Sequence, residues 1–168
     1  SCNDEILRSM SRPYTIEEFK NRVAYIRERI PDISISTDLI VGFPGEDEER
    51  FEDTLKNLKE IRFSFIHVFP YSRKRNTVAD RMEGHIDPKI KKARVKAVMD
   101  LEKEISEGFR KTFVGKTVKV LIERTKDGFS YGYCRQYFYV KVNGELNIGD
   151  LYDVVIDSVN EEVYGHVA

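Results

Sequence analysis

The segment Thr37-Asp38-Leu39-Ile40-Val41-Gly42-Phe43-Pro44-Gly45-Glu46 decides the fold, and an acidic run, residues 47–49, follows it. An apolar strand predicted over residues 33–41 breaks at Gly42, turns through Pro44-Gly45 and opens a helix. Strand–turn–helix junctions are where α/β proteins place their ligands. The four carboxylates of residues 46–49 complement the positive end of the helix dipole and would repel a phosphate. The junction therefore predicts contact with a neutral or cationic ligand; an ordinary turn with capping acids is the alternative.

The elements around this junction alternate between helix and strand. Thr15 and Glu18 have the spacing of a capping box, and apolar residues then recur every three or four positions over residues 16–29, which predicts a helix. A second helix is predicted after the turn, and the apolar residues 63–69 predict another buried strand. This α–β–α–β order favours parallel strands joined by helical crossovers. Two such strands leave a long unpaired edge, so we expect the later part of a larger α/β domain, and a chain that is a fragment.

The second half of the chain changes from a helical to an alternating pattern. A long helix is predicted from Pro88 to about Thr112, and five short strands follow within residues 117–167, with Asn143-Gly144 as a hairpin signal. Five short strands with tight turns predict a small all-β barrel of the oligonucleotide-binding kind. The fold class is therefore α/β followed by a small barrel. The exposed side of the long helix is expected to carry Lys89, Lys91, Lys92, Arg94 and Lys96.

Composition limits the classes of protein that remain. With 40% apolar and 34% charged residues among 168, the chain is expected to be a soluble globular protein. It has no apolar run long enough to cross a bilayer and no signal peptide, and its two cysteines form no C-x-x-C pair, so we expect reduced thiols and a cytoplasmic location. Residues 71–112 hold twelve basic and seven acidic side chains, which indicates contact with a polyanion.

Few side chains have the spacing of a catalytic or metal site. His67 lies within an apolar strand and is expected to be a core histidine, and His85 and His166 are isolated. Asp38 could contact a substrate at the end of its strand or bond to nearby backbone. No nucleophile–base set and no carboxylate pair is recognisable, so we predict no catalytic residue and no metal ligand in this chain.

The barrel segment instead has the composition of a nucleic-acid interface. Aromatic residues alternate there with basic ones, and aromatic faces can stack on unpaired bases while cations hold phosphates. The alternatives are that these aromatics only fill a barrel core and that the basic side chains are merely solvated. The predicted RNA contacts are Arg73, Lys74 and Arg75 in the basic segment, and Arg124, Lys126, Tyr131, Arg135 and Lys141 in the barrel.

Several of these motifs occur together in one known family. Gly42-Phe43-Pro44-Gly45-Glu46 after Thr37-Asp38, together with Phe69-Pro70-Tyr71-Ser72-Arg73 and Asn76-Thr77-Val78-Ala79, resembles the radical S-adenosylmethionine methylthiotransferases. The resemblance implies that residues 1–87 are the C-terminal part of a radical S-adenosylmethionine (β/α) barrel, residues 88–112 a linker helix and residues 113–168 a TRAM domain, an RNA-binding β-barrel. Residues 68–72 look most like the branch that methylthiolates N6-threonylcarbamoyladenosine in tRNA.

The resemblance also implies a cofactor site and a partner. Ile40, Gly42, Gly45 and Glu48 look like the superfamily's I-x-G-x-x-G-x-x-E motif, at the strand that helps to hold S-adenosylmethionine. The expected partner is the anticodon stem-loop of tRNA, and the sulfur donor cannot be read from the sequence. The full set of cofactor contacts implied by the resemblance is Ser1, Ile40, Gly42, Phe43, Pro44, Gly45, Glu48, Phe69 and Tyr71.

One departure from the family pattern is large. The family holds a 4Fe–4S cluster with a C-x-x-x-C-x-x-C triplet and has three further cysteines, whereas this chain has only Cys2 and Cys134, which match neither set. The chain is therefore expected to be inactive alone and to belong to a parent enzyme that adds a methylthio group at C2 of the modified adenine. Alternatives are a methylthiotransferase for isopentenyladenosine or for a ribosomal-protein aspartate, or a non-catalytic RNA-binding module. A TRAM-bearing uridine methyltransferase is disfavoured because no G-x-G-x-x-G occurs.

Overall fold

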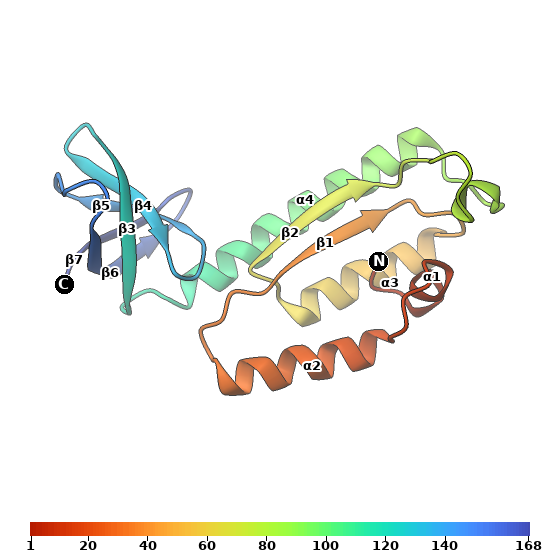
Figure 1. Ribbon diagram of the computed structural model, residues 1–168, viewed down its shortest axis with the longest axis horizontal. Helices are drawn as coiled ribbons and strands as arrows, with labels where there is room; N and C mark the ends of the chain where they lie inside the picture. Colours follow the sequence, from red (N-terminus) through yellow and green to blue (C-terminus); the bar gives the residue numbers. More distant parts are fainter. The chain divides into compact units, whose positions relative to one another are not determined.

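A computed structural model describes residues 1–168, which divide into two compact units, Ser1–Ile105 and Ser106–Ala168. The first unit holds the predicted α/β elements (Figure 1). None of its helices, nor any other in the structure, has the length and apolar character that a bilayer crossing demands. The elements are α1 (Asp4–Ser9), α2 (Ile16–Arg29), β1 (Ser36–Val41), α3 (Glu48–Ile61), β2 (Phe65–Pro70), a 3-10 turn η1 (Ala79–Arg81) and α4 (Pro88–Lys111), which continues into the second unit.

The sheet of the first unit consists of β1 and β2, which are parallel as predicted. α2 starts at the predicted capping box, in which Thr15 and Glu18 bond to each other's backbone N–H. The predicted strand of residues 33–41 begins only at Ser36. In the register, Asp38 lies opposite His67 and Ile40 opposite Phe69.

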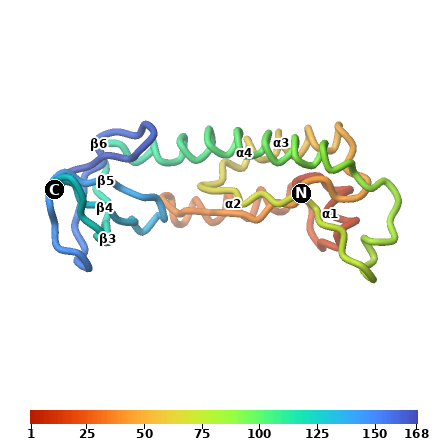
Figure 2. The backbone as a smooth tube through the Cα atoms, turned by 90° about the horizontal axis from the view of Figure 1, so that it is seen from above, coloured from red at the N-terminus to blue at the C-terminus, as the bar shows by residue number.

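The two faces of this sheet have different surroundings. Leu39, Val41 and Ile66 are buried in a core with side chains of α3 and α4, and Figure 2 shows both helices on the same side of the strands. The opposite face is uncovered. It carries Ser36, Asp38, Ile40, Phe65, His67 and Phe69, and we call it the open sheet face.

Three predictions are therefore wrong. The apolar residues 63–69 predict a buried strand, yet Phe65 and Phe69 are exposed because no element covers their side of the sheet. His67 is exposed for the same reason and is not a core histidine. On α4, Arg94 is buried rather than exposed, because it pairs with a buried carboxylate.

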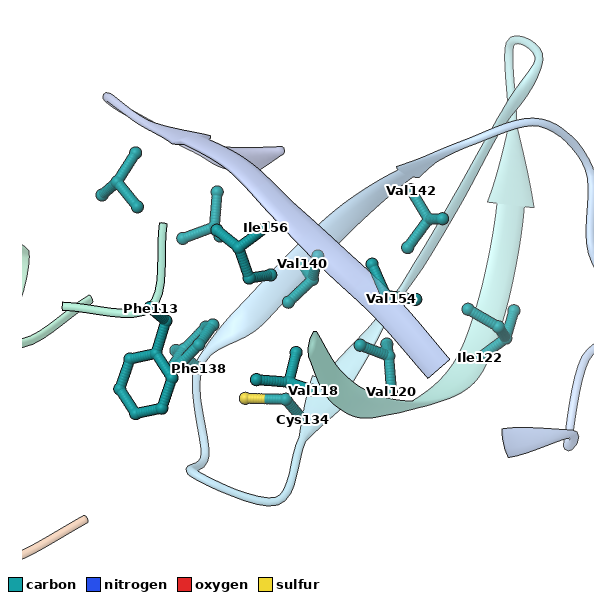
Figure 3. Close-up of a cluster of buried hydrophobic side chains, with 12 residues drawn as sticks. Phe113, Val118, Val120, Ile122, Cys134, Phe138, Val140, Val142, Val154 and Ile156 are labelled. Atoms are coloured by element: carbon teal, nitrogen blue, oxygen red, sulfur yellow. The ribbon is translucent and has the colours of Figure 1, made fainter. Parts of the chain in front are cut away.

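The second unit is the predicted small barrel, and the predicted fold class is confirmed. Its strands close in the order β3-β4-β5-β7-β6, with β5 and β7 parallel and all other pairs antiparallel. Alternate residues point inward, and Figure 3 shows a core made mainly of valine and isoleucine with Phe113 and Phe138 at one end. The strands are β3 (Thr117–Lys126), β4 (Phe129–Cys134), β5 (Tyr139–Asn143), β6 (Leu151–Val159) and β7 (Val163–Val167).

Candidate functional site

Half of the side chains on the open sheet face are apolar, namely Ile40, Phe65 and Phe69, and two are ionisable, Asp38 and His67. Ile40 and Phe69 lie side by side at the carboxyl ends of their strands, and the adjacent pair on the same face is Asp38 and His67. The His67 ring lies 4.4 Å from that of Phe65 and 6.4 Å from that of Phe69, centroid to centroid. Exposed apolar side chains at the carboxyl ends of parallel strands are suited to contact with a flat, uncharged ring.

A cavity of about 80 Å³ borders this face. Ser1, Arg12, Asp38 and Ile40 are among its lining residues. It therefore brings together two residues of the predicted cofactor set, Ser1 and Ile40, that are far apart in the sequence. Binding pockets for whole small molecules have roughly 300–1,000 Å³, so the cavity alone would hold only part of one.

The turn that follows β1 has a glycine at each bend. Gly42 and Gly45 have φ angles of +73° and +84°, in the region where a side chain is strained. The Phe43 ring contacts the Tyr71 ring at 5.1 Å, and the Tyr71 N–H donates to the Val41 carbonyl at 2.8 Å, so the segments after β1 and β2 are joined. The turn thus forms a fixed rim beside the open sheet face.

The carboxylates of this turn do not all lie where the sequence predicts. Asp47 caps α3 through the Arg50 N–H, and Glu48 and Glu49 lie in the first turn of the helix. Glu46 instead points inward and is fully buried, where it accepts from the Gly42 N–H and from Arg94. Burial raises the pKa of Glu46, and these two donors oppose that rise. Three carboxylates, not four, therefore act on the helix dipole.

The basic segment after β2 is organised around one aspartate. Arg73 donates to the Asp80 carboxylate at 2.5 Å and to its carbonyl at 2.9 Å, and the Asn76 N–H donates to the same carboxylate at 3.2 Å. The guanidinium of Arg73 lowers the pKa of Asp80. Lys74 and Arg75 are exposed and have no ion-pair partner in the structure. Two of the three predicted cations are therefore available to a polyanion, whereas Arg73 maintains the loop.

The outer surface of the barrel carries a row of side chains that crosses four strands. Arg124, Tyr131, Lys141 and Tyr164 are successive partners in the register of β3, β4, β5 and β7. Arg124 lies 4.5 Å and Lys141 5.8 Å from the centroid of the Tyr131 ring, and Lys141 also pairs with Glu162 at 3.1 Å. We call these four residues the cation–aromatic row. Since favourable contacts already surround the Tyr131 ring, it is only 8% exposed.

Two other tyrosines of the barrel are much more accessible. Tyr133 is 47% and Tyr137 84% exposed, and Tyr137 has a φ of +63° at the tip of the loop between β4 and β5. The predicted contacts Lys126 and Arg135 are also exposed. The sequence predicts an aromatic RNA-binding surface that includes Tyr131. In the structure, Tyr133 lies two residues further along β4 on the same outer face, and it is the more exposed of the two rings.

Comparison with known proteins gives this architecture a family. Residues 1–58 match the family model described as the radical SAM superfamily. The tRNA-2-methylthio-N(6)-dimethylallyladenosine synthase of Thermodesulfovibrio yellowstonii is 41% identical over 155 residues, which are 92% of this chain and 36% of that protein. Threonylcarbamoyladenosine tRNA methylthiotransferase MtaB of Thermotoga maritima is 37% identical over 96% of this chain and 37% of its own length. A probable threonylcarbamoyladenosine tRNA methylthiotransferase of Methanocaldococcus jannaschii is 42% identical over 77% of this chain and 30% of its own length.

The chain belongs to the radical S-adenosylmethionine methylthiotransferases. It spans about a third of the length of the curated relatives that it matches. The residues of this chain fit S-adenosylmethionine, one of the two cofactors of the family, and do not fit the other, the iron–sulfur cluster.

The part that fits is S-adenosylmethionine. Ile40 and Phe69 offer an exposed apolar surface to its adenine ring, and Asp38 on the same face offers a carboxylate to its positive charges. One buried oxygen of Glu46, Oε1, has no hydrogen-bond partner and remains able to accept. Of the other expected contacts, Gly42, Phe43, Pro44 and Gly45 form the adjoining turn, Tyr71 follows β2 and Glu48 lies on α3, bonded to Arg94 at 3.2 Å.

The part that does not fit is the iron–sulfur cluster. No group of three or more His, Cys, Asp or Glu side chains in residues 1–168 is arranged to hold a metal ion. Cys2 and Cys134 are both buried, and burial raises the pKa of the Cys2 thiol to about 11. Cluster ligands are thiolates, so neither cysteine is suited to that role.

Proposed function

We propose that this chain supplies part of the cofactor site and the RNA-binding barrel of an enzyme that adds a methylthio group at C2 of N6-threonylcarbamoyladenosine, beside the anticodon of tRNA. Residues 1–87 would be the C-terminal part of the radical S-adenosylmethionine barrel, 88–112 a linker helix and 113–168 the TRAM domain. The observation that carries the proposal is the open sheet face beside the Gly42–Glu46 turn, in a chain whose residues 1–58 match the radical SAM superfamily.

Each part of the chain has a separate role in this proposal. S-adenosylmethionine, when bound with a reducing iron–sulfur cluster, supplies the one-electron chemistry. Ile40 and Phe69 bind the adenine and exclude water from that side of it, and the turn of residues 42–46 fixes one edge of the cofactor. No side chain of this chain is assigned a catalytic role.

The tRNA contacts are assigned to cationic and aromatic groups of both units, all of them exposed except Lys141 and Tyr131. Lys74 and Arg75 bind phosphates of the anticodon stem-loop, as do the barrel cations Arg124, Lys126, Arg135 and Lys141. Tyr133 and Tyr137 stack on unpaired bases, and Tyr131 holds Arg124 and Lys141 in place. The names of the relatives described above support a tRNA substrate.

Two nucleosides are candidates for the substrate. The sequence of residues 68–72 favours N6-threonylcarbamoyladenosine, and relatives 37% and 42% identical are named for it. The second candidate is N6-dimethylallyladenosine, which is the isopentenyladenosine of the sequence analysis under another name. Relatives 41% identical are named for that nucleoside.

The test is nucleoside analysis of tRNA from a strain in which the gene encoding this chain is deleted. Liquid chromatography with mass spectrometry should show loss of 2-methylthio-N6-threonylcarbamoyladenosine and accumulation of its unmethylthiolated precursor. Loss of the dimethylallyl derivative instead would establish the second candidate. Unchanged levels of both 2-methylthio nucleosides would overturn the proposal.

A further inference from the structure

A buried ion pair connects α4 to the turn after β1. The side chain of Arg94 is 5% exposed and that of Glu46 is fully buried, with 3.0 Å between Arg94 Nη1 and Glu46 Oε2. Nη1 also donates to the Glu46 carbonyl at 2.6 Å, and Nη2 donates to Glu48 at 3.2 Å. The guanidinium lies 4.9 Å from the centroid of the Phe51 ring, which covers it from α3.

This pair fixes the turn at both of its ends. The Glu46 carboxylate accepts from the Gly42 N–H, which is the first backbone donor after β1. Arg94 therefore holds Glu46 directly through its carbonyl and Gly42 indirectly through the carboxylate. In between, the Glu46 N–H donates to the Phe43 carbonyl at 3.0 Å and closes the turn.

A second side chain of α4 acts on the same region. Lys91 crosses Gly42 so closely that a Cβ at that glycine would lie 2.2 Å from Lys91 Cγ. Its Nζ donates to the Tyr71 carbonyl at 3.1 Å. Hence one turn of α4 holds the backbone that follows β1 and also the backbone that follows β2, which are the two strand ends that border the open sheet face.

Stability alone does not account for a pair of this kind. Two charges lose much hydration when they are buried, and well-packed apolar side chains of similar volume are often as stabilising or more so. What apolar side chains cannot supply is the set of directed bonds to the Gly42 N–H and the Glu46 carbonyl. The pair thus determines the shape of the turn more than the stability of the fold.

We infer that Arg94 is a positioning residue, which holds the Gly42–Glu46 turn in the conformation that receives S-adenosylmethionine. This rests on the proposed function, because the turn is assigned there to the edge of the cofactor. When the whole ion pair is replaced by apolar side chains, the strands stay paired and the core stays packed, but the turn is no longer preorganised and the cofactor must order it on binding.

The test measures cofactor affinity and stability in the same variants of the full-length gene product. Isothermal titration with S-adenosylmethionine gives Kd, and thermal unfolding gives Tm. The decisive variant is Arg94→Met combined with Glu46→Met, which replaces the pair by apolar side chains of similar length. We expect its Tm to stay near the wild-type value while Kd rises at least about tenfold. Arg94→Lys keeps the charge but not the fork of donors, and should also raise Kd.

The control is Lys96→Met on the same helix, since Lys96 is exposed and pairs only with Asp100. It should leave both Kd and Tm unchanged. An unchanged Kd in the double variant and in Arg94→Lys would overturn the inference while leaving the proposed function intact. Failure of the wild-type protein to bind S-adenosylmethionine would instead overturn the proposed cofactor site, and this inference with it.

Discussion

The basic segment after β2 gives a prediction that can be worked out in numbers. Lys74 and Arg75 are exposed and unpaired, while Arg73 is bonded to Asp80, which also receives the Asn76 N–H. The loop that presents Lys74 and Arg75 is therefore held in place before any ligand arrives. Changing Lys74 and Arg75 to Gln removes two cations and leaves the Asp80 bonds intact.

The magnitude follows from the release of counterions. Each phosphate contact on a duplex contributes about 0.9 to the slope of log K against log salt, so two contacts contribute about 1.8. Between about 50 and 200 mM salt, a fourfold change, two contacts correspond to about a twelvefold difference in affinity. Over this range, the fold increase in the wild-type Kd should therefore be about twelve times the fold increase in the Kd of the double variant.

The assay is fluorescence anisotropy with a labelled anticodon stem-loop across a salt series. Arg22→Gln serves as the control, because Arg22 is an exposed arginine on α2, outside the basic segment. It should leave the salt slope unchanged. A double variant with the wild-type slope would refute the reasoning, since it would show that neither Lys74 nor Arg75 neutralises a phosphate.

Three further predictions concern other parts of the chain. Tyr133→Ala and Tyr137→Ala should each weaken binding of single-stranded RNA by about 1–3 kcal/mol for each base that the ring stacks on, and equal affinities in the same anisotropy assay would contradict the assignment. Gly132→Ala should lower the free energy of unfolding of the barrel by about 3 kcal/mol, because a Cβ there would lie 1.7 Å from the Leu121 carbonyl oxygen. Urea titration measures this change, and an unchanged midpoint would contradict the close approach of β3 and β4. Because the pKa of Cys2 is about 11, only about one-thousandth of its thiol should be thiolate at pH 8. Iodoacetamide should therefore label Cys2 far more slowly in folded than in unfolded protein, as measured by mass spectrometry. Equal labelling rates would contradict the burial of Cys2.

Local patterns predicted the elements of this chain well, because each depends on a short stretch of sequence. The capping box at Thr15 sets the start of α2, the Gly42–Gly45 bends separate β1 from α3, and period-two alternation over residues 117–167 gives the barrel. These signals are independent of what the elements later pack against.

The faces of the β1–β2 sheet could not be predicted in the same way. Apolar residues occupy both sides of β2, so the sequence read as a strand buried throughout, and His67 read as a core histidine. Which side is covered depends on where α3 and α4 lie, and that is a tertiary property. The exposed apolar row of Phe65 and Phe69 is instead a feature that a ligand or a further part of a protein would cover.

Arg94 is different, because the sequence did contain a signal for it. Arg94, Val98, Leu101 and Ile105 follow at steps of four, three and four, so Arg94 lies on the apolar face of α4. A basic residue on such a face requires a buried partner. Because Arg94 lies among several lysines in the sequence, it is easily assigned with them to the exposed side of the helix. For Tyr131, alternation placed the ring on the outer surface but could not show that Arg124 and Lys141 already cover it.

The central claim is that the open sheet face serves the methylthiolation of tRNA, and complementation of the deletion strain tests it most directly. The gene with Ile40→Asp is compared with wild type and with Ile148→Asp, a matched change at an exposed isoleucine of the barrel unit. We predict that wild type and Ile148→Asp restore 2-methylthio-N6-threonylcarbamoyladenosine, and that Ile40→Asp leaves only the unmethylthiolated precursor at an equal level of protein. Full restoration by Ile40→Asp would contradict the account.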